Sequence, residues 1–368
     1  MTLLDRYILR SLVVNYLIAL GVMMSLYVVL DLFVNMDEFT EGDASSGMVL
    51  AGILSYYGNN LFLYFAQLSG VITLFACLAS VARMRRQNEM TAVLASGVSL
   101  YRVAAPVIAF GLLAGALWVV DTEVIIPSVA HKLARRHDDA LGKKTYGVWF
   151  LKDRERALLS AQRFDPATRT MKRMLVIYRD ESGTVTHVLG AEEARWVPNE
   201  AYAVGGIWEL QRGELRARDS GDDRRLGPQG TVQRESVHLY QSDLTPEAIQ
   251  LRQSSQWVRY LDSSQLTQLV DKGELDLARI QHIKHARFAT PIVNLILLLL
   301  GLPFMLGADV GSILNDGARC LAVCGACFLI SFAGQNMSVE GPLAALPSWF
   351  SIFLFTPVVV VLLDRVKT

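Results

Sequence analysis

The hydrophobic residues of this 368-residue chain gather into long runs that contain almost no charge. Runs of roughly 20 such residues are long enough for a helix to cross a bilayer core of about 30 Å. One run alone would also suit a buried helix of a soluble protein, but six together predict an α-helical integral membrane protein with six transmembrane helices. The six predicted spans are Leu12–Val34, Leu61–Ala82, Val103–Val120, Ala289–Leu306, Cys320–Met337 and Ser348–Leu363.

The composition supports the same class of protein. Hydrophobic residues make up 52% of the chain and charged residues only 19%, whereas the surface of a soluble protein of this length needs more charge. The mean hydropathy is +0.31. The apolar part of the first run is too long for a cleavable signal peptide, so we expect it to remain as a membrane anchor.

The charges of the short connections predict the orientation of the spans, because cytoplasmic loops carry an excess of lysine and arginine. The first connection, Asn35–Gly47, contains four acidic residues and no basic residue. Basic residues lie at the N-terminus, in the second and fourth connections and in the tail: Arg6, Arg10, Arg83, Arg85, Arg86, Arg102, Arg319, Arg365 and Lys367. Both termini and the second connection are therefore predicted to face the cytoplasm.

The third connection is long and polar, and it predicts a domain outside the cytoplasm over residues 121–287. It divides the chain into a first membrane part, residues 1–120, and a second one, residues 288–368. About eight short strands between Gly147 and Tyr240 suit an inserted, β-jellyroll-like periplasmic domain, with core residues 147–240. Flanking helices are predicted over Val129–Leu141 and Ala248–Arg287. Asp219–Arg225 is expected to be a solvated turn.

The second connection contains an amphipathic stretch, "RMRRQNEMTAVLASGVS", which is Arg83–Ser99. Met90, Leu94 and other apolar residues of this stretch can share one side of a helix, and Gly97 is suited to end that helix. One interpretation is a solvated connector whose arginines lie on lipid phosphates. The other is a coupling helix that docks on a motor protein, and this second interpretation is the one we prefer.

Three segments resemble one known family. "NEMTAVLASGVS" is similar to the coupling segment of the lipopolysaccharide-export permeases, the LptF/LptG (YjgP/YjgQ) family. "HIKHARFATPIVNLILLLLGLPF" and the opening "LLDRYILRSL" are similar to further segments of these proteins, and the order of spans and β domain is the same. "LDRYI" leans slightly towards LptG. The resemblance covers essentially the whole chain.

The resemblance implies one permease subunit of an ABC transporter that extracts lipopolysaccharide from the bacterial inner membrane. Its implied partners are a cytoplasmic ABC ATPase dimer, a sister LptF/LptG-type permease and periplasmic LptC/LptA-like β-jellyroll proteins, which receive the lipid. ATP hydrolysis belongs to the ATPase, so we expect no enzymatic activity, cofactor, metal or nucleic-acid partner for this chain. The residues expected to couple it to the ATPase are Arg86, Glu89, Met90, Leu94 and Gly97.

The residues expected to meet the lipid are less typical of the family. Some LptG proteins have lysines at the outer end of the first span, where this chain has Asp31, Asp37 and Glu38. Lys284 and Arg287 share a helix face just before the fourth span and are the proposed replacement for phosphate binding. The alternative is that they reach ordinary headgroups or pair with an acidic residue nearby, and the candidates are Asp271, Glu274 and Asp276. Leu30 and Phe33 are expected on the acyl side.

Small residues on the fifth span predict a close helix contact, either within the chain or with the sister subunit. The interface with that subunit is predicted at Ala318, Ala322, Gly325 and Ala326. The cysteines of the same span, Cys320, Cys324 and Cys327, share one helix face and are interpreted as packing residues rather than as a metal site.

Three other functions remain as alternatives. An ABC-linked permease for another lipid, or a mechanotransmission subunit, would share several of these features, although the latter class usually has four spans. An intramembrane enzyme would need acid–base groups, for which the candidates are Asp31, Asp121, Glu123 and His131. The chain contains no phosphate-binding G-x-x-x-x-G-K-[ST] loop, no H-E-x-x-H pair and no G-x-S-x-G motif.

Overall fold

The computed structural model describes residues 3–40, 46–134, 144–202, 204–217, 233–254, 256–271, 277–306, 313–337 and 343–364. They form two compact units. The helical unit consists of Met1–Val34, Asn60–Ser128 and Arg259–Thr368. The second unit consists of Asn35–Asn59 and Val129–Val258 and contains the β-sheet.

Six helical segments among the described residues are long and apolar enough to cross a membrane, as the sequence predicts. They are built from α1 (Leu3–Val34), α3 (Ser46–Arg86), α5 (Leu100–Val120) with η1 (Asp121–Ile125) and α6 (Ile126–Leu133), α9 (Leu277–Leu306), α10 (Ile313–Asn336) and α11 (Leu346–Asp364). Most are longer than the apolar runs. At 1.5 Å per residue, the 32 residues of α1 extend about 48 Å, more than a bilayer core requires.

The helical unit packs around apolar side chains from its spans, and Leu12, Ile72 and Leu300 are fully buried in it. Glycines let two of these helices approach closely. A Cβ at Gly70 of α3 would overlap the side-chain amide of Asn294 of α9, and one at Gly301 of α9 would meet Leu74. Small residues at such crossings allow backbones to come together without a side chain between them.

Shorter elements lie between the spans and within the sheet domain. They are α2 (Met36–Thr40), α4 (Glu89–Ala95), α7 (Pro246–Leu251), the 3₁₀ turns η3 (Arg154–Arg156) and η4 (Trp257–Tyr260), and α8 (Ser263–Asp271). The flanking helix predicted over Val129–Leu141 is described only as far as the end of α6. The one predicted over Ala248–Arg287 is broken into α7, η4, α8 and the first turns of α9, so a single helix there was wrong.

The described strands form one antiparallel sheet in the sequential order β1-β2-β3-β4-β5-β6. They are β1 (Tyr146–Lys152), β2 (Leu158–Asp165), β3 (Thr170–Arg179), β4 (Val185–Pro198), β5 (Gly206–Ala217) and β6 (Gln233–Tyr240). The sheet domain is confirmed, but these residues give six strands where the sequence suggested about eight. Each strand pairs with the next along the chain, which differs from the crossed connections of a jelly roll.

One face of the sheet carries the apolar core of the second unit. Its largest members include Trp208, Phe164, Leu159 and Met171, all less than 2% exposed. Trp196 of β4 lies directly opposite Trp208 of β5, and their rings meet edge to face with centroids 5.2 Å apart. Cross-strand aromatic pairs of this kind stabilise the register of a sheet.

Candidate functional site

The segment Arg83–Ser99, called here the corner segment, is not one helix. α3 continues to Arg86, the chain turns at Asn88 with a φ of 57°, and α4 begins at Glu89. α4 ends where predicted: Gly97 adopts a φ of 80°, and its N–H donates to the carbonyl of Leu94 at 2.9 Å. The corner segment is therefore a helix end, a turn and a second short helix.

The apolar side of α4 is used within the chain. Met90 is only 6% exposed and belongs to the same core as Ile8 and Leu12 of α1. Leu94 is half-buried against that core. The expectation that Met90 is an anchor buried against the ATPase therefore does not fit this arrangement, because its side chain already packs inside its own subunit. Arg86 and Gly97 are exposed.

Two polar contacts connect the corner segment to other spans. The hydroxyl of Tyr7 in α1 lies 2.9 Å and 2.8 Å from the two carboxylate oxygens of Glu89 and donates to them. Arg85 forms an ion pair with Asp316 of α10, with Nη1 and Oδ2 3.1 Å apart. Tyr7 and Asp316 were not predicted as site residues, because their partners lie 82 and 231 residues away and no local pattern indicates the pairing.

The basic residues at the start of α9 have different surroundings. The side chain of Arg287 is 11% exposed and forms an ion pair with Glu123, with Nη1 and Oε1 3.1 Å apart. Its Nη2 donates to the backbone carbonyls of Arg259 and Leu261. The observed partner, Glu123, differs from the described candidate Asp271, whereas the other two candidates, Glu274 and Asp276, lie outside the described residues. Because the side chain is largely shielded from solvent and its charge is already paired with Glu123, the predicted phosphate-binding role of Arg287 does not fit the structure.

Lys284 remains a candidate for contact with an anionic headgroup. Its side chain is half-buried, and Nζ donates to the hydroxyl of Thr267 in α8 at 2.6 Å. An ammonium group has three donors, so one bond to a hydroxyl leaves donor capacity for a phosphate. The predicted pair at the start of α9 is therefore reduced to this single lysine.

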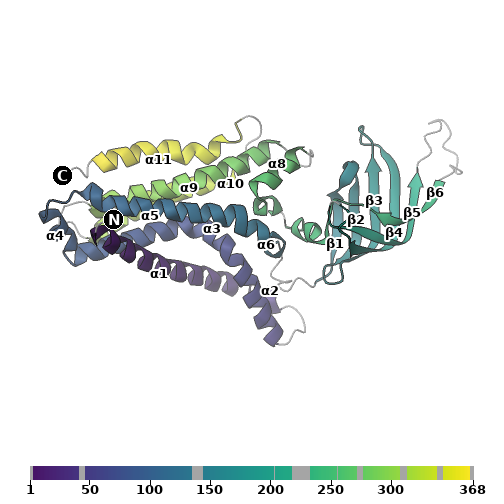
Figure 1. Ribbon diagram of the computed structural model, residues 1–368, viewed down its shortest axis with the longest axis horizontal. Helices are drawn as coiled ribbons and strands as arrows, with labels where there is room; N and C mark the ends of the chain where they lie inside the picture. Colours follow the sequence, from purple (N-terminus) through teal and green to yellow (C-terminus); the bar gives the residue numbers. More distant parts are fainter. Residues whose placement is uncertain are drawn as a thin grey trace. The chain divides into compact units, whose positions relative to one another are not determined.

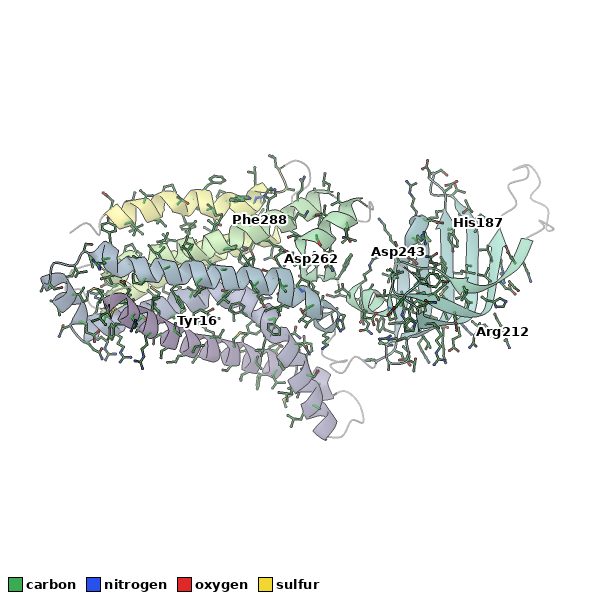
Figure 2. All side chains as sticks on the ribbon, viewed as in Figure 1. Tyr16, His187, Arg212, Asp243, Asp262 and Phe288 are labelled. Carbon is green, nitrogen blue, oxygen red and sulfur yellow. The ribbon has the colours of Figure 1, made fainter. Side chains whose placement is uncertain are left out.

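Glu123 lies in the π-helical turn η1 and connects three segments. Besides Arg287, it accepts bonds from the backbone N–H of Ser263 and from its hydroxyl, both at 2.9 Å. These bonds hold the start of α8, where Asp262 also accepts a bond from the Gln265 N–H at 2.7 Å. Asp262 is labelled in Figure 2. Glu123 thus stabilises the junction of η1, α8 and α9 through its hydrogen bonds and ion pair. This structural role argues against the acid–base role considered for it.

Asp121 of the same π-helical turn is 2% exposed, and neither carboxylate oxygen has a hydrogen-bond partner among the described residues. A π-helical turn departs from regular α-helical geometry, and such turns are frequent at functional sites.

The residues predicted to meet lipid or the sister subunit lie on the outer surface of the helical unit. Leu30 and Phe33 of α1 are 58% and 83% exposed. On α10, Ala318, Ala322 and Ala326 are exposed, Gly325 is half-buried, and a Cβ added at Gly325 would meet nothing within 4 Å. The three cysteines of α10 face the opposite way and are buried. The exposed positions of Leu30, Phe33 and the three alanines leave room for the predicted contacts with lipid and with the sister subunit.

The sheet has a cavity of about 220 Å³. Its lining is mixed, with the aliphatic and aromatic residues Leu189, Leu215, Val237, Leu239, Tyr178 and Tyr240 and the polar residues Arg154, Glu155 and Gln241. A space of this size holds part of an apolar chain rather than a whole lipid.

Six potential spans and an inserted sheet domain define a multi-pass membrane protein with a large domain outside the bilayer. The chain matches the family described as "Lipopolysaccharide export system permease LptF/LptG" over residues 6–365, and it therefore belongs to that family. The family is a transport component rather than an enzyme, and it implies an ABC transporter of the inner membrane with lipopolysaccharide as substrate. No curated protein matches the chain.

Proposed function

We propose that this chain is one permease subunit of a transporter that extracts lipopolysaccharide from the outer leaflet of the inner membrane. The observation that supports this most is the family match across residues 6–365, which includes all six potential spans and the sheet domain. A sister permease completes the lipid path, and a cytoplasmic ATPase dimer supplies the energy. The sheet domain passes the lipid to periplasmic LptC/LptA-like proteins.

The proposed orientation places the termini and the corner segment in the cytoplasm and the sheet domain in the periplasm. Support comes from the arginines of the corner segment, Arg83, Arg85 and Arg86, and from the acidic connection after α1. The ATPase then binds the surface of the corner segment that is not packed against the core of the helical unit. That surface includes Arg86, Glu89, Gly97 and the half-buried Leu94.

The lipid is proposed to enter beside α1 and α10. The exposed side chains of Leu30 and Phe33 offer an apolar wall for acyl chains, and Lys284 offers a cation for an anionic headgroup. The alanines of α10 form the proposed seam with the sister subunit, because small side chains allow two helices to approach. The segment "LDRYI" leans slightly towards LptG rather than LptF, and this assignment stays a prediction.

The coupling proposal is tested by Glu89→Lys. The change reverses a charge on the proposed docking surface, and losing one partner of a desolvated charge pair commonly costs about 2–5 kcal/mol. We expect the ATPase to bind at least roughly 30-fold more weakly, since 1.4 kcal/mol is a factor of ten, while the permease still inserts. Co-purification of the ATPase and ATP-driven lipid release by the reconstituted transporter measure this.

The matched control is Glu181→Lys, the same charge reversal in the exposed turn between β3 and β4. It should leave assembly and transport unchanged. Normal assembly and transport by Glu89→Lys would remove the corner segment from the coupling pathway.

A further inference from the structure

The spans α1 and α10 each reach the corner segment through one polar side chain near one end of the helix. Tyr7 lies in the second turn of α1 and donates to Glu89. Asp316 lies in the first turn of α10 and pairs with Arg85. Figure 1 shows the start of α1 near α4. These are the two spans whose outward-facing residues were assigned above to the lipid and to the sister subunit.

α1 is buried in the helical unit mainly in the half that contacts the corner segment. The buried residues of α1 are Ile8, Leu12 and Tyr16, all in its first half. Asn15 adds a hydrogen bond to Ser80 of α3 at 2.8 Å, again in that half. From Leu17 to Val34, no residue of α1 is buried in the chain. The second half of α1 is packed less tightly: Ala19, Leu20 and Met23 are only half-buried against the core, and the ring of Tyr27 meets that of Tyr64 with centroids 4.3 Å apart. A shift of the tightly packed first half is therefore expected to displace the second half.

The contact with α10 is shielded from water. The side chains of Arg85 and Asp316 are only 12% and 20% exposed. Ion pairs that are partly buried are screened less by salt and water than surface pairs, and they hold a fixed geometry. On α10 the buried cysteines pack inward and the exposed alanines face outward, so a rotation imposed at Asp316 changes what the alanine face presents.

We propose that Tyr7 and Asp316 are positioning residues through which movement of the corner segment is transmitted to α1 and α10. This inference rests on the proposed function, since it requires the ATPase to move the corner segment. Glu89 then has two tasks: it contributes charge to the docking surface, and its carboxylate holds Tyr7. Neither Tyr7 nor Asp316 is part of the proposed docking surface.

The test uses the complete transporter, reconstituted with the sister permease and the ATPase in vesicles that contain lipopolysaccharide. The measured quantity is the amount of lipopolysaccharide released per ATP hydrolysed. Tyr7→Phe removes the hydroxyl alone. We expect the ratio to fall by roughly 2- to 30-fold, the range for residues that modulate coupling between sites by 0.5–2 kcal/mol, while the ATPase co-purifies as with wild type.

Tyr101→Phe is the matched control, because Tyr101 is an exposed tyrosine at the start of α5. It should leave the ratio unchanged. On α10, Asp316→Ala should lower the ratio, and the conservative change Asp316→Glu should retain most of it because the carboxylate can still pair with Arg85. The Asp316 variants also keep the test informative if Tyr7→Phe fails to insert.

A wild-type ratio in both Tyr7→Phe and Asp316→Ala would overturn the inference and leave the proposed function intact. Loss of the ATPase from Tyr7→Phe would also overturn it, because Tyr7 would then be a docking residue. Failure of the proposed function has a different signature, which is a wild-type complex that lacks an ATPase or releases no lipopolysaccharide when ATP is supplied.

Discussion

Arg287→Ala is expected to destabilise the helical unit by about 3 kcal/mol, because it leaves a largely shielded carboxylate without its cation. Arg287 and Glu123 are 11% and 30% exposed in this pair. The change also removes the donor that serves the carbonyls of Arg259 and Leu261. Thermal unfolding of the purified full chain in detergent measures the effect as a lower midpoint.

Lys284→Ala is the control for this prediction, because it removes a cation from the same helix face, one turn earlier. The Nζ of Lys284 donates to a hydroxyl, Thr267 Oγ1. The expected loss of stability is about 0.5 kcal/mol or less, as for most surface substitutions. If the two variants unfolded at the same temperature, Arg287 would not be the structural anchor described here.

Asp153→Ala is expected to destabilise the sheet domain by about 3 kcal/mol, since buried donors left without an acceptor cost roughly 1–3 kcal/mol each. The carboxylate of Asp153 accepts from the hydroxyls of Tyr240, at 2.7 Å, and Ser242, and from the Asp243 N–H at 2.9 Å. Tyr240 is 5% exposed and Ser242 is fully buried. Burial, followed by the neighbouring Asp153 carboxylate, raises the pKa of Tyr240, so its hydroxyl stays a donor.

Asp180→Ala is the matched control, because Asp180 also accepts several hydrogen bonds but lies in an exposed turn. The bonds from Ser182 and the Thr184 N–H hold the pKa of Asp180 below its usual value. Its stabilising contribution is therefore present above the ordinary pKa of an aspartate and is lost as the pH falls. At pH 7 the Asp180 variant should lose much less stability than the Asp153 variant; the reverse order in tryptophan-fluorescence unfolding would contradict this account.

The six spans were predictable because each contains a long apolar run, and this signal does not depend on what the helix contacts. The inserted β domain was also predictable from its short strands, and the turn between β3 and β4 contains Gly183 at a φ of 84°. The described residues contain six strands rather than about eight because β4 and β5 are long. β4 extends over 14 residues and β5 over 12, and the alternation in β5 is interrupted where the pairing with β6 shifts between Glu209 and Gly213.

The site residues were less predictable, because their roles depend on contacts between distant parts of the chain. Met90 has the pattern of a docking residue, yet the core at the start of α1 already buries it. Arg287 looked available for phosphate because Glu123, its partner, lies 164 residues earlier. The break at Asn88 depends on one residue with a positive φ, for which the amphipathic pattern gives no signal.

The central claim is that this chain is the permease of an ATP-driven lipopolysaccharide exporter, and transport itself tests it most directly. The complex is purified in mild detergent, its bound proteins and lipids are identified by mass spectrometry, and it is reconstituted with lipopolysaccharide and a soluble periplasmic acceptor. The account predicts a bound ABC ATPase and a sister permease, together with transfer of lipopolysaccharide to the acceptor that requires ATP. A complex without an ATPase, or one that transfers a different lipid and leaves lipopolysaccharide in the membrane, would contradict it.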